Sequence, residues 1–473
     1  MEGSNFVSRG AAVKPLAKNV EVEEYVCVVD AFSTGACIAW EASKRGYGVV
    51  HVLSLAPSEE LAGMVPAHLR GAIPWATTLN VDLSRPTEEA AKLLAAEATR
   101  FVEKKGGKLI AVICGAETGV KLADYLSANL ATNKTILTNG TRHTEARRNK
   151  ALMGDAVRAA GVRAVRQMTA TSWEPVKEWL QYDWGLKCHD DEVCDLIVKP
   201  LESAGSDGVT ACYKVSDVPK AIESLVGNRN GLGLLNEGVL VQEFLRGTEY
   251  VVDTVSRAGN HKVLALWEYD RRPTNGSGFV LHGQKLLSGS NAVVSQLVPY
   301  AEKVLDALEL NNGPSHMEVK LTPTNGKVLD PCLVEVGARC HGAEGFWMSI
   351  ADETCGRNQA VAALDSYVNP DSFKSLPKLP PHTLLKAGCV KYLLVHQAGT
   401  LLSLDSRGLD AIKALPSYRG HEIFLTVGKP VIPTANCFSW GGIVKLVNAT
   451  DQGLQRDYDI IEQLCLKGLW TIV

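Results

Sequence analysis

The sequence has 473 residues, a formal net charge of −3, and 46% hydrophobic and 21% charged content. This length predicts about three domains of ordinary size, and the balanced charge, without a long basic run, excludes the usual footprint of nucleic-acid or anionic-membrane binding. Twelve cysteines occur without any CxxC spacing, which favours reduced, buried thiols over disulfides or a zinc site. We therefore expect a reducing compartment and a cytoplasmic protein.

The N-terminal region lacks the continuous apolar stretch of a signal peptide, and no later run reaches membrane-spanning length. We interpret residues 1–22 as a disordered tail, with a transit peptide as the alternative. Residues 23–140 alternate short apolar strands with helical segments, which indicates a parallel sheet covered on both faces. The expected strands cover residues 25–30, 48–54 and 109–114, and the expected helices cover 34–44, 87–105 and 117–130.

The turn at residues 30–35 has no dinucleotide-binding fingerprint, so we favour a connecting role over ligand binding. Residues 131–144 are polar and read as a linker. Helical spacing then predicts a helix over residues 144–160, which carries Lys150 and ends at Gly161. Residues Cys188, His189 and Cys194 match no common zinc spacing, and we interpret them as surface loop residues.

Residues 196–209, LIVKPLESAGSDGV, predict an apolar strand that ends at Lys199, a loop of small residues, and a second strand. Such a loop lets backbone N–H groups approach anionic oxygens closely, and the lysine adds a positive charge beside them. This pattern favours a triphosphate-binding loop, and a solvated hairpin loop is the alternative.

Many short strands follow, with a few helices, as in an α+β domain. We expect strands within 239–255, 261–269, 278–287, 316–323 and 328–346, and helices over 291–310 and 454–467. Glu318 and Glu335 each lie between apolar residues. An unpaired buried carboxylate is costly, so a cation should face them, and binding through carboxylates and substrate phosphate is typical of magnesium.

The ordered set of Lys150, KPLESAGSDGV, VQEFLRGTEYVVD, HMEVKLTP and EVGAR resembles the ATP-grasp superfamily, and more narrowly its carboxylate–amine ligases of the L-amino-acid ligase type. The resemblance covers roughly residues 25–473. It implies an α/β plus α+β fold, with a Rossmann-like N-terminal domain (23–140), an ATP-grasp domain (141–376) and a C-terminal α+β domain (377–473).

The same resemblance implies an ATP site. Lys150 and Lys199 match the two triphosphate lysines, and two cations on separate elements suit a spread-out negative charge. Glu249 matches the carboxylate that binds the ribose. The loop that closes over the phosphates is matched by Ser203, Gly205, Ser206 and Gly208, and the adenine-binding strand by Gln242, Glu243, Phe244 and Leu245.

The resemblance also implies Mg²⁺ bound by Glu318 and Glu335. The usual Glu-x-Asn-x-Arg motif is here Glu335-Val-Gly337-Ala-Arg339, and Gly337 has no side chain to ligate a metal. Arg339 matches the arginine that steadies the transferred phosphoryl group, for which its planar fork is suited.

Three histidine and carboxylate positions are matched less closely. His282 aligns by order with a catalytic, phosphate-facing histidine, and a structural histidine is the alternative. His341 and Glu344 fall where such ligases form the acceptor pocket, and neither receives a fixed role.

The activity implied by the resemblance is ATP-dependent amide or peptide formation from an amino acid and an amine through an acyl phosphate, with release of ADP and phosphate. The expected partners are small-molecule carboxylates and amines, not nucleic acid or membrane, and a homo-oligomer is left open. The alternatives are a biotin-carboxylase-like enzyme and a non-catalytic ATP-binding regulator. We rank the regulator low because Glu318, Glu335 and Arg339 are retained.

Overall fold

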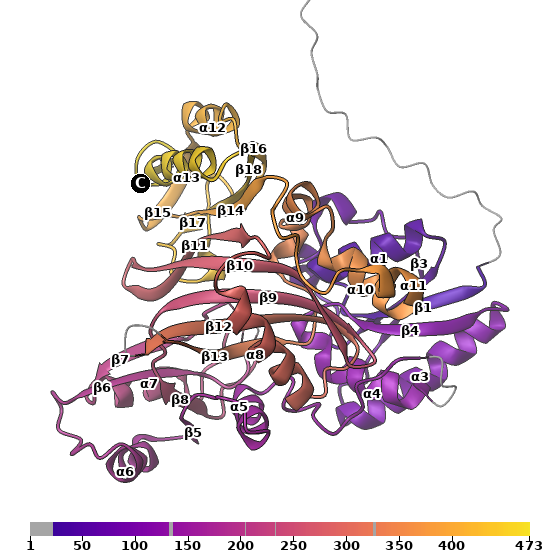
Figure 1. The fold of residues 1–473 in the computed structure, drawn as a ribbon, viewed down its shortest axis with the longest axis horizontal. Coiled ribbons are helices and arrows are strands. Elements are labelled where there is room, and N and C mark those ends of the chain that lie inside the picture. Colours follow the sequence, from indigo (N-terminus) through magenta and orange to yellow (C-terminus); the bar gives the residue numbers. More distant parts are fainter. Residues whose placement is uncertain (1–21, 132–135, 204, 232, 325–327) are drawn as a thin grey trace, which may run out of the picture.

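The computed structural model describes residues 22–473 except 132–135, 204, 232 and 325–327. The predicted tail therefore lies outside the described residues, apart from Val22. Within the described part, the strands form four sheets, and Figure 1 shows the N-terminal elements on the right, the largest sheet in the centre and the C-terminal elements at the upper left. Among the helices of the described part, none is long and apolar enough to cross a membrane.

The N-terminal domain is a parallel sheet of order β3-β2-β1-β4 with helices on both faces, as its alternating pattern predicts. Helices α3 and α4 pack on one face, and α1 packs on the other together with α10 from much later in the chain. The elements are β1 (Glu24–Val29), α1 (Thr34–Lys44), β2 (Gly48–Leu53), α2 (Glu59–Gly63), η1 (Ala67–Leu69), β3 (Trp75–Asn80), α3 (Thr87–Lys104), β4 (Lys108–Cys114), η2 (Glu117–Gly119) and α4 (Val120–Leu130).

From β1, the chain adds β2 and β3 on one side of the sheet and β4 on the other. The carboxyl ends of β1 and β4 therefore lie side by side at this switch in strand order, and ligands usually bind in the crevice at such a point. The buried Asp30 carboxylate joins these ends, since it accepts hydrogen bonds from the Ser54 backbone N–H at 2.7 Å and from the Thr118 hydroxyl at 2.5 Å. The turns after β1 and β4 are thereby fixed at one edge of the domain.

A second, smaller sheet of order β5-β8-β6-β7 follows. Its elements are α5 (Lys150–Ala159), β5 (Gln167–Ala170), α6 (Trp173–Asp183), β6 (Val193–Pro200), β7 (Thr210–Lys214), α7 (Asp217–Leu225) and β8 (Val239–Glu243). Helix α5 begins at Lys150 and not at residue 144 as predicted, because the Asn149 side chain caps it by accepting the N–H groups of Ala151 at 3.0 Å and Leu152 at 3.2 Å.

The structure corrects the prediction for Cys194. This residue lies in β6, is 4% exposed, and directs its thiol to the Cys212 carbonyl at 3.4 Å. Acidic residues precede Cys194 and are not typical of a strand, so the sequence did not predict that β6 begins at Val193. All twelve cysteines are free thiols, and ten of them are buried.

The largest sheet is antiparallel and has the order β13-β12-β9-β10-β11-β14-β18-β16. Its first part and associated helices are β9 (Thr248–Arg257), β10 (Asn260–Thr274), β11 (Ser277–Leu287), α8 (Val294–Ala307), β12 (Gly313–Thr324), β13 (Val328–Gly337), η4 (Ala343–Gly345), α9 (Met348–Cys355), α10 (Gln359–Val368) and α11 (Pro370–Ser375). Glu318 and Glu335 are directly opposite each other on β12 and β13, so a strand pair positions the two predicted metal ligands.

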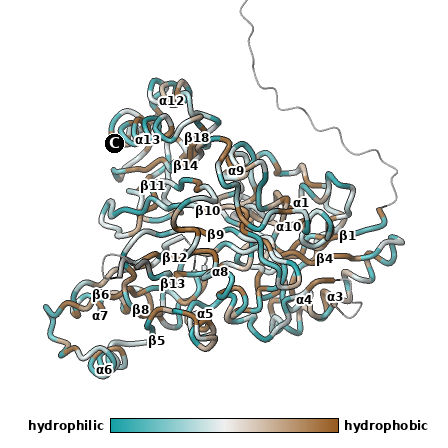
Figure 2. Tube along the Cα trace, viewed as in Figure 1, coloured by the Kyte–Doolittle hydropathy of each residue, from teal (hydrophilic) through white to brown (hydrophobic). Residues whose placement is uncertain are grey.

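The C-terminal elements extend this same sheet, because β14 pairs with β11 across the predicted boundary at residues 376–377. They are β14 (Ala387–Leu393), β15 (Gly399–Leu404), α12 (Ser406–Lys413), β16 (Tyr418–Ile423), β17 (Pro430–Val431), η5 (Cys437–Ser439), β18 (Gly442–Asn448), α13 (Asp451–Leu466) and β19 (Trp470–Ile472). Hydrophobic residues concentrate along the strands, and hydrophilic residues along the outer loops (Figure 2).

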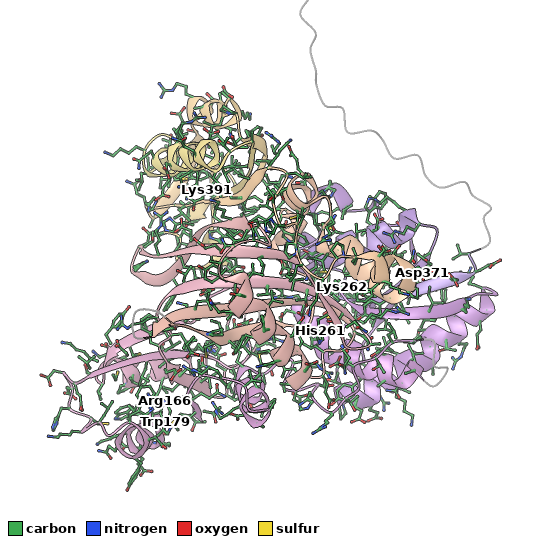
Figure 3. All side chains as sticks on the ribbon, viewed as in Figure 1. Arg166, Trp179, His261, Lys262, Asp371 and Lys391 are labelled. Carbon is green, nitrogen blue, oxygen red and sulfur yellow. The ribbon has the colours of Figure 1, made fainter. Side chains whose placement is uncertain are left out.

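Helix α13 covers the C-terminal strands and holds a buried charge. The Lys391 ammonium on β14 contacts the Glu462 carboxylate of α13 at 3.1 Å and lies over the Tyr458 ring at 4.0 Å from its centre. Figure 3 labels Lys391 within this C-terminal part.

Candidate active site

A cavity of about 540 Å³ lies between the two antiparallel sheets and is closed at one end by the N-terminal turn that contains Ser33. This volume suits a nucleotide-sized ligand. Thirteen of the predicted site residues line the cavity: Lys150, Lys199, Ser203, Gly205, Ser206, Gln242, Glu243, Phe244, Leu245, Glu249, Glu318, Glu335 and Arg339. Only Gly208 and His282, of the predicted set, do not line it.

The two predicted lysines lie in the cavity wall in different states. The Lys150 ammonium donates to the Ser203 carbonyl at 2.8 Å and pairs with the Glu335 carboxylate at 3.1 Å. Among the described residues, no hydrogen bond or ion pair holds the Lys199 ammonium. Burial, and then the charge of Lys150, lower the pKa of Lys199 to about 8. A bound polyanion would relieve both effects.

The small-residue loop joins β6 to β7 and has consecutive left-handed backbone positions, with φ of 65° at Gly205 and 66° at Ser206. The Ser206 hydroxyl accepts a hydrogen bond from Arg271 at 2.8 Å. The Gly205 carbonyl accepts the Cys437 N–H at 3.3 Å, so the loop touches the C-terminal part of the chain. Gly208 packs below the loop against Pro200, which explains its absence from the cavity wall.

The predicted adenine-binding strand forms another side of the cavity. The Gln242 side chain donates to Gln167 at 2.8 Å, and Arg163 pairs with the Glu243 carboxylate at 2.5 Å. The Phe244 ring packs edge-on against Phe279, with 6.0 Å between ring centres. An apolar ring beside fixed amide and backbone groups is suited to a flat heteroaromatic base.

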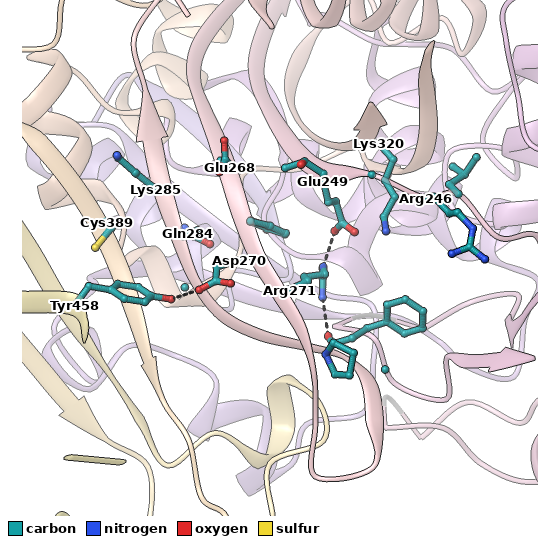
Figure 4. A pocket seen from close by; sticks show the side chains of 18 of the residues that line it. Arg246, Glu249, Glu268, Asp270, Arg271, Gln284, Lys285, Lys320, Cys389 and Tyr458 are labelled. Atoms are coloured by element: carbon teal, nitrogen blue, oxygen red, sulfur yellow. Dashed lines mark hydrogen bonds and ion pairs between the residues drawn. The ribbon is translucent and has the colours of Figure 1, made fainter. Parts of the chain in front are cut away.

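Arg271 on β10 organises the carboxylates, and sequence reasoning missed it. Its guanidinium contacts the Glu249 carboxylate at 2.6 Å and the Glu318 carboxylate at 3.5 Å. Figure 4 shows the Arg271–Glu249 pair from an adjoining hollow of about 560 Å³, which Phe244, Lys320 and Arg271 also line. Arg271 therefore joins the predicted ribose carboxylate, a predicted metal carboxylate and, through Ser206, the predicted phosphate-binding loop.

A buried network behind Glu318 was also missed. The Asp253 carboxylate accepts hydrogen bonds from His316 Nδ1 at 2.8 Å and from His341 Nδ1 at 2.9 Å. Although burial opposes it, the neighbouring His341 and His316 hold the pKa of Asp253 well below its usual range. His316 Nε2 then faces the Glu318 carboxylate at 3.7 Å. The available signal was the two-residue spacing of His316 and Glu318, which puts both on one face of a strand.

Arg339 is held by a residue of the N-terminal domain. Its Nε lies 2.8 Å from the carboxylate of Glu117, the first residue of η2, and the Arg148 guanidinium lies 3.5 Å from the other oxygen of that carboxylate. A Cβ atom at Gly337 would lie 2.9 Å from both Arg339 Cζ and Glu117 Oε2. The pair thus fills the space that a side chain at position 337 would need, which accounts for glycine in the motif.

The structure does not bring His282 into the cavity. Its Nε2 is 2.8 Å from the Thr274 hydroxyl, and its Nδ1 is 3.9 Å from the Glu462 carboxylate of α13. Burial, and then the nearby Lys391 and Arg272 charges, lower the pKa of His282 to about 4. The position therefore favours the structural alternative, because the strand register turns the ring toward the C-terminal helix.

Comparison with known proteins identifies a domain and a fold. Residues 193–344 match the ATP-grasp domain family. The L-amino acid ligase from Bacillus licheniformis superposes with a TM-score of 0.68 over 93% of this chain and 97% of its own, at 18% sequence identity. This is an ATP-grasp fold. The ATP-grasp domain contains the loop between β6 and β7, the strand pair of Glu318 and Glu335, and Arg339.

Other ATP-grasp structures are similar over nearly the whole chain. An N5-carboxyaminoimidazole synthetase from Staphylococcus aureus complexed with ADP has a TM-score of 0.58 at 15% identity and covers 94% of this chain and 99% of its own. The curated Dapdiamide A synthase of Enterobacter agglomerans is 31% identical over 265 residues, which are 56% of this chain and 58% of that protein. The match thus spans a little over half the length of that relative.

The residues present also fit a magnesium ion. Glu318 and Glu335 are a cross-strand pair on β12 and β13, and both line the cavity with carboxylate oxygens, which are the hard ligands that Mg²⁺ selects. Although burial opposes it, the neighbouring His316 and Arg271 hold the pKa of Glu318 below its usual range. The ATP-grasp cavity therefore presents an ionised oxygen ligand beside two lysines.

Proposed function

We propose that this protein is an ATP-dependent carboxylate–amine ligase, which forms an amide or peptide bond from an amino acid and an amine through an acyl-phosphate intermediate. The observation that carries the proposal is the convergence of Lys150, Lys199, Glu318, Glu335 and Arg339 on one cavity. The likeness to L-amino acid ligase and Dapdiamide A synthase supports an amino acid as the carboxylate substrate.

In this proposal, Phe244 and the backbone of β8 hold adenine, and Glu249 holds the ribose. Lys150 and Lys199 neutralise the triphosphate from separate elements, since phosphoryl transfer depends mainly on positioning and charge stabilisation. The loop around Ser206 closes over the phosphates and excludes water, which would otherwise hydrolyse a mixed anhydride.

Arg339 holds the carboxylate oxygens as they attack the terminal phosphorus, and Glu117 fixes the direction of its guanidinium. Magnesium, when bound by Glu318 and Glu335, supplies positive charge to the phosphate oxygens. Conversion of the carboxylate to an acyl phosphate replaces one difficult displacement by two easier ones.

A biotin-carboxylase-like activity is the second candidate. The biotin carboxylase domain of the Hydrogenobacter thermophilus 2-oxoglutarate carboxylase has a TM-score of 0.57 at 11% identity, over 95% of this chain and 90% of its own. That likeness is of the fold alone.

One assay separates the candidates. Purified protein is incubated with ATP and Mg²⁺, together with amino acids singly and in pairs, or with bicarbonate and biotin, and ADP, AMP and phosphate are measured. A ligase releases ADP and phosphate fastest when a carboxylate and an amine are both present. Turnover that requires biotin, or no turnover with any amino acid pair, would refute the proposed function.

A further inference from the structure

Glu344 is distinctive among the carboxylates of the cavity wall. In the described part of the chain, the other carboxylates that line the cavity all take part in a hydrogen bond or an ion pair, whereas the Glu344 side chain takes part in neither. The partners of the others are Gly231 for Asp207, Arg163 for Glu243, Arg271 for Glu249 and Glu318, and Lys150 for Glu335. Glu344 thus offers an unpaired anion to the cavity.

The backbone around Glu344 is fixed by the N-terminal domain. The Glu344 N–H donates to the Ser33 hydroxyl at 2.8 Å, and the Thr34 hydroxyl donates to the His341 carbonyl at 2.6 Å. Trp347 Nε1 donates to the Gly342 carbonyl at 2.9 Å. The backbone of the segment that carries Glu344 is therefore held from both sides, and the side chain of Glu344 lines the cavity.

The surroundings of the carboxylate are apolar and anionic. Phe346 and Phe424, whose ring centres are 6.2 Å apart, line the cavity beside it. Burial, and then the charge of Glu422 on β16, raise the pKa of Glu344 to about 7, while Arg70 after η1 opposes this shift. The Cys37 thiol of α1 also faces it, and burial raises the pKa of that thiol to about 11, so the thiol stays protonated.

We infer that Glu344 binds the ammonium form of the acceptor amine and removes its proton, so that it is a catalytic residue for the second half of the reaction. This inference rests on the proposed ligase function. The cavity is also lined by Lys199, which is buried without a partner among the described residues and suits phosphate, whereas the unpaired Glu344 carboxylate, once ionised, suits an ammonium group. A base whose pKa lies near the working pH is the most efficient proton acceptor.

The ammonium group gives one proton to the Glu344 carboxylate, and the freed nitrogen lone pair attacks the carbonyl carbon of the acyl phosphate. A C–N bond forms, and the bond between that carbon and the phosphate oxygen breaks, with its electron pair leaving on phosphate. The second proton lost from nitrogen ends on the phosphate, and Glu344 returns its own proton to solvent.

Two acceptors of different basicity test the inference. Each standard L-amino acid is offered as the carboxylate, first with hydroxylamine, which is largely unprotonated near neutral pH, and then with a second amino acid, which is largely an ammonium ion. For Glu344→Gln we expect hydroxamate formation within about twofold of wild type and amide formation reduced about 10²-fold, the size of one general base. Glu422→Gln is the comparison variant: because the Glu422 charge raises the pKa of Glu344, its removal should lower the pH at which amide formation levels off and leave hydroxamate formation within about twofold.

The pH profile gives a second readout. In the wild type, the kcat/KM for the amine should rise up to about pH 7, the pKa of Glu344, and then level off. In Glu344→Gln it should keep rising about tenfold per pH unit until the free amine predominates.

Three results would overturn the inference. Equal loss of both products in Glu344→Gln would assign Glu344 to the carboxylate substrate, and retention of both would remove it from the reaction. If wild type formed neither product, the proposed function itself would fail, which the hydroxamate reaction shows independently of any variant.

Discussion

At the residue scale, the two lysines of the cavity differ in whether their ammonium groups have partners in the protein. Lys150 is satisfied by the Ser203 carbonyl and the Glu335 carboxylate. Lys199 is buried without such partners in the described part of the chain, and its pKa is lowered to about 8. A cation kept in this state lowers the stability of the empty protein, and the proposed binding of a nucleotide would recover that free energy.

Replacement of Lys199 by methionine should therefore raise the melting temperature of the nucleotide-free protein at neutral pH and abolish its stabilisation by ATP. Because the folded chain holds this proton more weakly than the unfolded chain, the contribution of Lys199 to stability rises between pH 8 and 10.5. The variant should lose that rise. Thermal melts across this pH window measure both effects.

Lys150→Met is the matched control, because its removal leaves the Glu335 carboxylate without its cation and should lower the melting temperature. Ligase activity should fall at least ~10²-fold in Lys199→Met. Activity within a few-fold of wild type, or a lower melting temperature for Lys199→Met, would contradict this account of the site.

Gly337 provides a second residue-scale prediction. Gly337→Asn restores the side chain usual at this position, yet its Cβ would lie 2.9 Å from Arg339 Cζ and Glu117 Oε2. We expect the variant to lose activity, by roughly 10²-fold as for one displaced electrostatic contact. The measurement is kcat at saturating ATP across a Mg²⁺ titration. Increased activity or tighter Mg²⁺ dependence would show that the space is open to a metal ligand.

At the element scale, the loop between β6 and β7 is the part of the site that sequence reasoning located best. Its small residues and the lysine that precedes it are contiguous in sequence. What the sequence could not show is its contact with the C-terminal part, where a Cβ on Gly205 would lie 1.9 Å from Cys437 Sγ. Such contacts depend on tertiary packing and have no local pattern.

Gly205→Ala should therefore slow the reaction, because the loop could not rest against Cys437 and because φ of 65° disfavours a side chain. Cys437→Gly in the same protein should recover part of the loss, and a double-mutant cycle of kcat measures that coupling. Strictly additive effects of the two substitutions would show that the loop does not close on the C-terminal part.

Two element boundaries and three site residues were also not predicted correctly from the sequence. The helix that carries Lys150 was predicted to begin at residue 144, but the Asn149 cap starts it at Lys150. Cys194 was predicted to lie in a loop because acidic residues precede it, but it lies in β6. Residues Glu117, Asp253 and Arg271 were missed because each acts through a partner that is far away in sequence.

At the scale of the whole molecule, the site is complete only where three parts of the chain meet. The N-terminal domain supplies Ser33 and Glu117, the smaller sheet supplies Lys199, and the largest sheet supplies Glu318 and Arg339. The ATP-grasp fold and its α/β plus α+β class were predicted from an ordered set of motifs and are confirmed. The side chains that join the parts required the structure.

The central claim is that this assembly activates a carboxylate as an acyl phosphate, and isotope transfer tests it most directly. An amino acid found to support turnover is labelled with ¹⁸O in its carboxylate and incubated with ATP, Mg²⁺ and an amine, and the released phosphate is examined by mass spectrometry. The account predicts one labelled oxygen in the phosphate for each amide formed, together with ADP. Label that stays wholly in the amide and the remaining acid, or release of AMP and pyrophosphate, would contradict it.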